Sequence, residues 1–393
     1  MVLRNKGRHA RRVLTADGEI ELCRRYFWAR GREGVYPVDS AAGIEQDSVS
    51  PGAREIVCRL GMVEDFAGAA EDAGRIGNVP VCRERLRQLV ESEAQKVRQA
   101  RESGKLAASW SAADAAVKPG GKTRMYEGTD GVMVPTVTRE EKDKRRREQI
   151  TRRQQRGKAG LGNSKPLALR RPGSDERFKE MKIGVFYDQE KKHRHVFATE
   201  DDCQGYGSLL KAFAAQVGFE RADETISLVD GAKWIATQVC AALLLLKVLL
   251  LDFYHLSQHV HATALCCFGD CEAGREWASA RLAEIKELGV GAVLVAIDAL
   301  KKKLRSPAKL KSLTLLREYL GQRLEMLDYR NALANGWDIG SGPTEAMCKT
   351  LTLRLKRPGM KWDRDHAAGM MNLAAMYQSG QAKTYWSAAR AAA

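Results

Sequence analysis

Short apolar segments with the pattern of strands alternate with helical segments through the middle of this chain, and this order most constrains its fold. An extended segment, 122–138, precedes a strand pair within 181–200 and a helical segment at 206–219. A further strand ends at Val229 and leads into another helical segment, and the apolar stretch 247–251 is one more strand. The alternation predicts an α/β fold in which helices flank a mixed sheet.

The other segments surround this core with regions of different composition. Alternation around an Ala-Asp-Gly turn predicts a hairpin within 12–26. Three short helical patterns with a glycine-containing turn before the last fit a helix-turn-helix unit, although short helices are also common in proteins that do not read DNA. We expect a hairpin region at 1–49, a helical and DNA-binding region at 50–102, a linker at 103–121, a core at 122–255, an all-helical insertion at 256–338 and C-terminal core helices at 339–393.

The charge of the chain is strongly positive. Its 65 Lys and Arg residues exceed its 49 Asp and Glu residues, which gives a net charge of +16. Segment 139–179 holds 15 basic and 6 acidic residues with few aliphatic ones, and we predict that it forms a mobile basic loop. A charge of this sign favours a polyanionic partner, most often nucleic acid. The loop then acts either as a DNA-gripping arm or as a solvated spacer.

The nine cysteines are irregularly scattered and include no CxxC pair, which favours a reducing cytoplasm over a disulfide framework. No long apolar stretch follows the basic N-terminus, so we do not expect a signal peptide. The most apolar run, 239–251, is too short to cross a bilayer, which requires about 20 residues. We interpret this run as the end of a buried helix followed by a buried strand, and we expect no membrane association.

Three acidic residues stand where a ligand site would form. Asp130 lies in YEGTDG and Asp230 in SLVDGAKW, each followed by glycine, and Glu345 lies near the start of a helix. Ligands of α/β sheets bind at strand ends, and carboxylate oxygens suit Mg²⁺ or Mn²⁺. Two such ions can catalyse phosphodiester chemistry. An Asp-Gly pair alone is a common turn, so the prediction depends on the combination of acids in this order.

The Glu345 helix lies in GSGPTEAMCKTLTLRLKRPGMKW. Pro343 suits the first helical position, which makes Gly342 the cap and places Glu345 in the first turn. At about 100° per residue, Lys349 and Lys356 share the face of Glu345 together with Thr352, so the helix presents either a metal ligand beside phosphate-binding cations or a solvated Glu–Lys pair. The basic residues that we expect to bind DNA are Lys349, Arg354, Lys356, Arg357 and Lys361.

At these motifs the chain resembles the DDE transposases of bacterial insertion sequences, in the ISKra group related to Mutator-type transposases. The resemblance rests on YEGTDGVMVP, LVDGAKWI, LLLDFYH and IGSGPTEAMCKTLTLRLKRPGMKW, and it covers roughly residues 120–380. It implies a ribonuclease H-like core, an all-helical insertion before the Glu helix, and a triad of Asp130, Asp230 and Glu345 that is catalytic and binds two Mg²⁺ or Mn²⁺ ions. It also implies that Asp252 and His255 support the site, although His255 is equally consistent with a hydrogen-bonded core histidine.

The resemblance further implies a function and its partners. We expect metal-dependent cleavage and strand transfer of double-stranded DNA, at the ends of the element and at its target, by several copies of the protein at the bacterial nucleoid. The related proteins resemble zinc ribbons near the N-terminus, and YFWARGREGVYPVD has no cysteine there, so 1–49 is expected to be a degenerate ribbon. The alternative is a catalytically inactive or domesticated DNA-binding protein derived from a transposase.

A zinc site is a second interpretation of the metal-ligating residues. Histidines and cysteines crowd one segment, but their spacing fits no standard zinc site and much of the segment has a helical pattern, so this interpretation is the weaker one. The residues concerned are His255, His259, His261, Cys266, Cys267 and Cys271.

Overall fold

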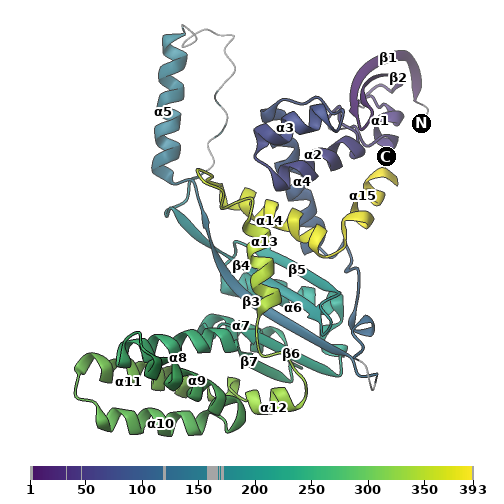
Figure 1. The fold of residues 1–393 in the computed structure, drawn as a ribbon. Helices are drawn as coiled ribbons and strands as arrows, with labels where there is room; N and C mark the ends of the chain where they lie inside the picture. Colours follow the sequence, from purple (N-terminus) through teal and green to yellow (C-terminus); the bar gives the residue numbers. More distant parts are fainter. Residues whose placement is uncertain are drawn as a thin grey trace.

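The computed structural model shows a mixed α/β protein with a five-stranded mixed sheet at its centre. A helical region with an N-terminal hairpin lies at one end of the molecule, and a helical insertion lies at the other (Figure 1). The structure describes residues 3–31, 33–45, 47–117, 121–156, 167, 169 and 172–391.

The sheet has the strand order β5-β4-β3-β6-β7. The strand β3 (Arg124–Pro135) pairs antiparallel with β4 (Phe178–Asp188), which pairs antiparallel with β5 (Arg194–Thr199). On its other side β3 pairs in parallel with β6 (Glu224–Val229), and β6 pairs in parallel with β7 (Val248–Leu251). The predicted strands, including the strand pair, are confirmed.

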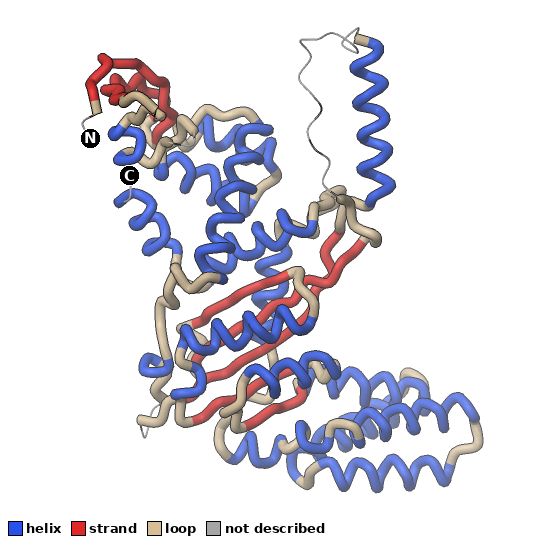
Figure 2. The backbone as a smooth tube through the Cα atoms, turned by 180° about the vertical axis from the view of Figure 1, so that it is seen from behind, coloured by secondary structure: helices blue, strands red, loops and turns tan. Residues whose placement is uncertain are grey.

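Helices cover both faces of this sheet. On one face, α13 (Gly342–Thr352) packs on β3 and β4, and α14 (Arg364–Gln378) packs on β5. On the other face, α6 (Cys203–Val217) packs on β4 and α7 (Lys233–Ala242) on β6 (Figure 2). Alternate residues of β3 therefore enter two separate apolar cores, and the even-numbered ones face α13.

The predicted hairpin is confirmed and is longer than expected, with β1 (Arg4–Thr15) paired to β2 (Gly18–Trp28). A short helix, α1 (Pro37–Ala41), follows it. The buried carboxylate of Asp39, on α1, pairs with Arg11 of β1 at 2.7 Å and with Arg24 of β2 at 2.5 Å. Ion pairing thus fixes the hairpin to the helix, without the cysteine pairs of a zinc ribbon.

Three helices form the region after the hairpin: α2 (Pro51–Val63), α3 (Phe66–Arg75) and α4 (Arg83–Glu102). Ser50 caps α2 as its Ser-Pro start predicts, since its hydroxyl accepts from the amide of Ala53. The helix α4 packs along α14 and also contacts α2 and α3. The C-terminal end of α4 is buried in the core of the protein. The three helices are therefore joined to the sheet domain.

Arg101 shows how firmly α4 is attached. Its guanidinium is fully buried and donates to the side chains of Asn372 and Gln381, each at 2.9 Å, and to the carbonyl of Val196 on β5. A last helix, α15 (Ala382–Ala391), packs back against α2. The N- and C-terminal regions therefore build one unit on the edge of the sheet (Figure 1).

The segment 103–121 is not the free linker that its composition predicts. Trp110 is only 6% exposed and stacks on His193, with the ring centroids 5.6 Å apart. Ala112 and Ala115 are also buried, in the core under α6. Because these apolar side chains pack against the sheet domain, the described part of the segment is a fixed strap.

The prediction of a basic loop at 139–179 is wrong for its first part. Residues Arg139–Gln155 form the helix α5, which begins with a capping box in which Thr138 and Glu141 each bond the other's backbone amide. None of its residues is buried, and the helix projects away from the sheet (Figure 1). Of the remainder, 157–166, 168, 170 and 171 lie outside the described residues, and β4 has begun by 179.

The segment between β7 and α13 is helical, as its pattern predicts. It comprises α8 (Phe253–Phe268), α9 (Glu272–Glu287), α10 (Val290–Lys303), α11 (Pro307–Gly321) and the short α12 (Tyr329–Ala334). Most of the histidine- and cysteine-rich segment belongs to α8, which spreads the side chains from His255 to Cys267 along about 18 Å of helix. No helix in the described ranges is both long and apolar enough to cross a membrane.

Candidate active site

Asp130 and Asp230 lie side by side at the sheet. Thr129 of β3 and Val229 of β6 are register partners in neighbouring parallel strands; Asp130 is the next residue of β3, and Asp230 directly follows the end of β6. Adjacent strands are about 4.8 Å apart, so the two backbones present their carboxylates in one row. The β6 strand ends at this row, where ligands of such sheets bind.

The electrostatics of Asp130 reflect this arrangement. Burial raises the pKa of the Asp130 carboxyl, and the negative charge of Asp230 raises that pKa further. The nearby His255, in the first turn of α8, acts in the opposite direction. Hydrogen bonds from the Cys348 thiol and from the amide of Gly131, at 2.7 Å, lower that pKa. A bound cation would also stabilise the charged form of the carboxylate.

The turn that carries Asp230 is held by the helical insertion. Arg323 donates from Nε and Nη2 to the carbonyl of Gly231, at 3.1 and 2.8 Å. Gly231 has φ +84°, and a Cβ there would lie 2.6 Å from Leu251 and 2.7 Å from Arg323 Nε. The amide of Ala232 donates to Asp230 at 2.8 Å. Glycine is therefore required by both conformation and space, and Arg323 fixes the direction of the turn.

Glu345 lies on α13, the helix that packs on β3. A Cβ at Gly128 of β3 would lie 1.9 Å from the hydroxyl oxygen of Thr344, so α13 and the strand are in close contact. One turn after Glu345, the Cys348 thiol lies against the Asp130 carboxylate. Burial, followed by the charges of Asp130 and Glu345, raises the pKa of that thiol. Asp130 and Glu345 thus both lie near one thiol at the contact between α13 and β3.

Asp252 continues the row but has a different role. It follows Leu251 of β7, the register partner of Val229, and is fully buried. Its carboxylate accepts from the amides of Tyr254 and His255 at the start of α8, and from both the amide and the hydroxyl of Ser341. These bonds use the oxygens of Asp252 to join the start of α8 to the start of α13.

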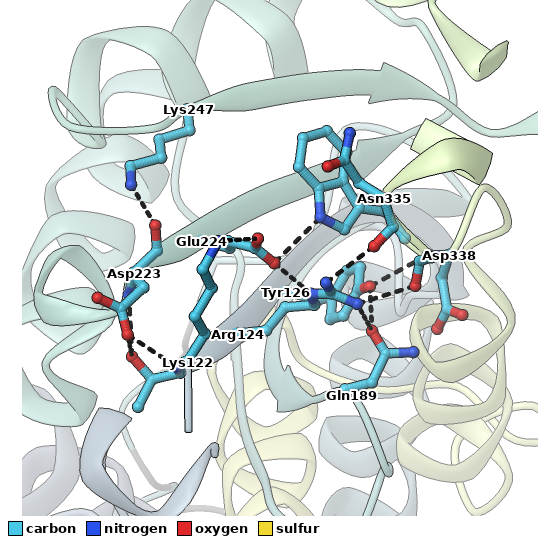
Figure 3. Close-up of polar contacts among 12 residues, drawn as sticks. Lys122, Arg124, Tyr126, Gln189, Asp223, Glu224, Lys247, Asn335 and Asp338 are labelled. Carbon is cyan, nitrogen blue, oxygen red and sulfur yellow. Dashed lines mark hydrogen bonds and ion pairs between the residues drawn. The ribbon is translucent and has the colours of Figure 1, made fainter. Parts of the chain in front are cut away.

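The segment that leads from the insertion to α13 is fixed to the opposite end of β3 (Figure 3). Arg124 pairs with Glu224 at 2.5 Å and donates to the carbonyls of Asn335 and Gly336, at 2.9 and 2.8 Å. The amide of Asp338 donates to the hydroxyl of Tyr126, two residues further along β3, at 3.0 Å. The path of the chain into α13, and so the position of Glu345, follows from these contacts.

The start of α13 differs by one residue from the prediction. Ser341, not Gly342, is the N-cap, and the Glu345 amide donates to the Ser341 carbonyl at 3.1 Å. The helix ends at Thr352, which is buried, and Lys356 lies beyond the helix end. The predicted face of four residues therefore does not exist; only Lys349 accompanies Glu345, at 3.8 Å.

Arg354 is not the surface cation that the sequence predicts. It is 4% exposed, and its guanidinium lies over the rings of Phe66 and Trp362, at 4.7 and 5.1 Å. Its Nε donates to the carbonyl of Gly61 at 3.2 Å. Burial lowers the pKa of Arg354 to about 10. The side chain joins the segment after α13 to the helical region.

The other four predicted DNA-binding residues are at or near the surface. Lys349 and Lys356 are exposed. Arg357 donates to a backbone carbonyl at the end of α2, at 2.6 Å, and Lys361 pairs with Glu141 of α5. These residues follow the polypeptide from α13 toward α5.

The donor set at the row fits a hard divalent ion. Among the residues that the structure describes, neither Asp130 nor Asp230 forms an ion pair with a basic side chain, and each accepts one backbone amide. Among the described residues, one group of three potential metal ligands has its ligand atoms within 4.8 Å of one another. It consists of Asp363, Asp365 and His366 and lies on a different part of the surface. The carboxylates of Asp130, Asp230 and Glu345 are therefore not grouped this closely in the structure.

Several residues of the site were not expected from the sequence. Cys348 is one turn from Glu345, a spacing that a helical pattern reveals once the helix is assigned. Arg323 is 92 residues from Gly231 and has no local signal.

No protein-family model matches the sequence, and the curated proteins include no match either.

Proposed function

We propose that this protein is a DDE-type DNA transposase with a ribonuclease H-like core, which cleaves and joins DNA at the ends of an insertion sequence. The observation that carries the proposal is the place of Asp130 and Asp230, each directly after one member of the Thr129–Val229 register pair of two parallel strands, with Glu345 on the helix that packs on β3. The strands β3, β4 and β5 pair antiparallel with one another in sequence order, and β6 and β7 run parallel to β3. This is the arrangement expected for a ribonuclease H-like core. The motif resemblance described above supports the same conclusion.

The three acids divide the work of the site in this proposal. Asp130 and Asp230 supply oxygens from the sheet, and Glu345 supplies oxygens from α13. Mg²⁺ or Mn²⁺, as a pair of ions, would provide activation of the attacking oxygen and stabilisation of the leaving one. Asp252 and Arg323 hold α13 and the Asp230 turn in place. No side chain needs to form a covalent intermediate, because water and then a DNA 3′ hydroxyl serve as nucleophiles.

The surface charge supports DNA as the substrate. The helix α5 contains eight Lys or Arg and four Asp or Glu residues, and none of its residues is buried. A helix that is polar on all sides depends on charge pairs or on a partner for its stability. A DNA duplex satisfies such a surface through its phosphates. We therefore assign α5 as an arm that contacts DNA.

Strand transfer is the test that separates a transposase from a simple nuclease. The purified protein is incubated in Mg²⁺ with precut element ends that carry free 3′ hydroxyls, together with a target plasmid. We expect joined products, and none from ends blocked by a 3′ deoxy nucleotide. Nicking without joining would reduce the assignment to a metal-dependent nuclease. DNA binding with neither reaction would favour a non-catalytic, transposase-derived protein.

A further inference from the structure

A cavity of about 370 Å³ lies between the helical region and the sheet domain, away from the row of acids. It is bounded by α3 and α4, by the start of α5, and by the segment between α13 and α14. These elements come from distant parts of the sequence and converge only here. The volume suits a phosphate group with part of its nucleotide.

The cavity carries a net positive charge. Its basic side chains outnumber its acidic ones by five to two; the basic ones are Arg83, Arg87, Lys142, Arg145 and Lys361, and the acidic ones are Glu91 and Asp363. Arg87 is paired with Glu91, and Lys142 is paired with Asp363 at 2.6 Å. Arg83 and Arg145 are exposed and form no salt bridge with any described residue. Two guanidinium groups thus remain for an incoming anion, and Arg suits phosphate oxygens well.

The floor of the cavity is aromatic. Phe66 and Trp362 pack edge to face, with their ring centroids 6.0 Å apart. The buried guanidinium of Arg354 lies against both rings, and its Nη1 and Nη2 atoms have no hydrogen-bond partner among the residues that the structure describes. A cation buried without a hydrogen-bonded counter-ion adds positive potential to the cavity that the rings border. The site therefore combines anion attraction with apolar surface, as nucleic-acid sites do.

The strand β3 sets the distance between this cavity and the active site. Trp362 is bonded to the end of β3, its amide donating to the Pro135 carbonyl at 3.1 Å and its carbonyl accepting from the Val137 amide at 3.0 Å. From Asp130 to Pro135 the strand is continuous. Five residues at about 3.3 Å each give roughly 17 Å. Successive phosphates of one DNA strand advance about 3.4 Å along the helix axis, so this span corresponds to about five nucleotides.

We infer that this cavity binds the phosphate backbone of a DNA strand about five nucleotides from the bond held at Asp130 and Asp230, with Arg83 and Arg145 as the contacts. The position relative to the cleaved bond rests on the proposed function. The existence of the phosphate site does not, because it depends only on the charge and shape of the cavity.

The first test measures binding in EDTA, where no cleavage is expected, with a 30-base-pair duplex that ends at the precut 3′ hydroxyl. Arg83→Ala and Arg145→Ala are each expected to weaken binding several-fold and to lower the slope of log affinity against log salt by about one. Arg75→Ala is the matched control, because this exposed arginine of α3 does not line the cavity. Binding and salt slope that stay at the wild-type values in both cavity variants would overturn the inference.

The second test locates the contact. Uncharged methylphosphonates replace single phosphates at positions three to eight from the 3′ hydroxyl. We expect the largest loss of wild-type affinity near position five, and no further loss there in the Arg83→Ala, Arg145→Ala double variant. If the double variant still loses affinity when the phosphate near position five is replaced, the cavity does not bind that phosphate. Neither test requires nicking, so a protein that passes both and never cleaves DNA would refute the proposed function and leave the phosphate site standing.

Discussion

Asp130 and Asp230 occupy one row of the sheet, each immediately after one member of the Thr129–Val229 register pair. Their backbone separation is therefore set by strand pairing and not by a loop. Glu345 is positioned differently, because side-chain packing on β3, the hydrogen bonds of Ser341 to Asp252 and the contacts that fix the segment before α13 hold the helix on the strand. The third acid is the part of the site most sensitive to distant substitutions.

Gly128→Ala tests this sensitivity. The new methyl group would lie 1.9 Å from the Thr344 hydroxyl oxygen and would push α13 away from β3. We expect a loss of nicking of at least tenfold, and a destabilisation of about 1–3 kcal/mol from the overpacking. Single-turnover nicking and urea unfolding measure the two effects separately.

Thr344→Ala in the Gly128→Ala background is the matched control. Removal of the hydroxyl leaves the Thr344 Cβ 3.1 Å from the new methyl group, so the double variant is expected to recover part of the lost activity. If the two substitutions are additive instead, the contact between α13 and β3 does not position Glu345.

Arg323→Ala tests whether the insertion holds the Asp230 turn. Loss of two hydrogen bonds to the Gly231 carbonyl should let the turn move, and outer-shell substitutions of this kind typically cost about 10–100-fold in metal affinity or activity. We expect the half-saturating Mg²⁺ concentration for nicking to rise. Arg323→Lys should restore part of the effect.

Arg317→Ala is the control for that experiment. Arg317 belongs to the same insertion but is exposed and pairs with Asp298, so its loss should leave the Mg²⁺ dependence unchanged. Equal shifts in both variants would mean that the insertion acts through its general stability and not through Arg323.

Glu127 predicts a particular dependence of stability on pH. It is fully buried on β3, accepts from the hydroxyls of Thr129 and Ser227 at 2.5 Å each, and burial raises its pKa from 4.5 to about 7. Between pH 4.5 and about pH 7, the folded protein holds a proton on Glu127 that the unfolded chain has released. Rising pH therefore favours unfolding. The loss from this residue approaches about 3 kcal/mol above pH 7.

Glu127→Gln should remove this component, because the amide does not titrate. Urea unfolding at pH 5 and pH 8 compares the two proteins, and the wild type is expected to lose more stability over that interval. Equal losses would show that Glu127 has no raised pKa in the folded protein.

The sequence predicted those parts of the fold that have a local pattern. The strands ending at Val229 and Leu251 are apolar and short. The strand end at Val229 marked Asp230 as a candidate ligand, whereas Asp252 was implied only by the resemblance. The helix α5 was missed because a helix with no buried face has no hydrophobic period. Its capping box of Thr138 and Glu141 was the available signal.

The remaining differences depend on tertiary contacts. Trp110 packs in the core although Ala, Ser and Gly surround it in the sequence, so composition alone predicted a linker. Arg354 looked like a surface cation because its burial depends on Phe66 and Trp362, which lie on other elements. Arg323 approaches Gly231 only after the insertion folds back on the sheet.

Metal-dependent nicking by variants of the three acids tests whether Asp130, Asp230 and Glu345 form a catalytic triad. Wild-type protein, Asp130→Asn, Asp230→Asn and Glu345→Gln are compared on DNA that carries the element's ends, in Mg²⁺ and in EDTA, with DNA affinity measured alongside. We expect nicking by the wild type in Mg²⁺ only, loss of nicking by at least a thousandfold in each variant, on the order of 4 kcal/mol of barrier, and DNA affinity close to that of the wild type. Full nicking by Asp230→Asn would contradict the assignment of this triad.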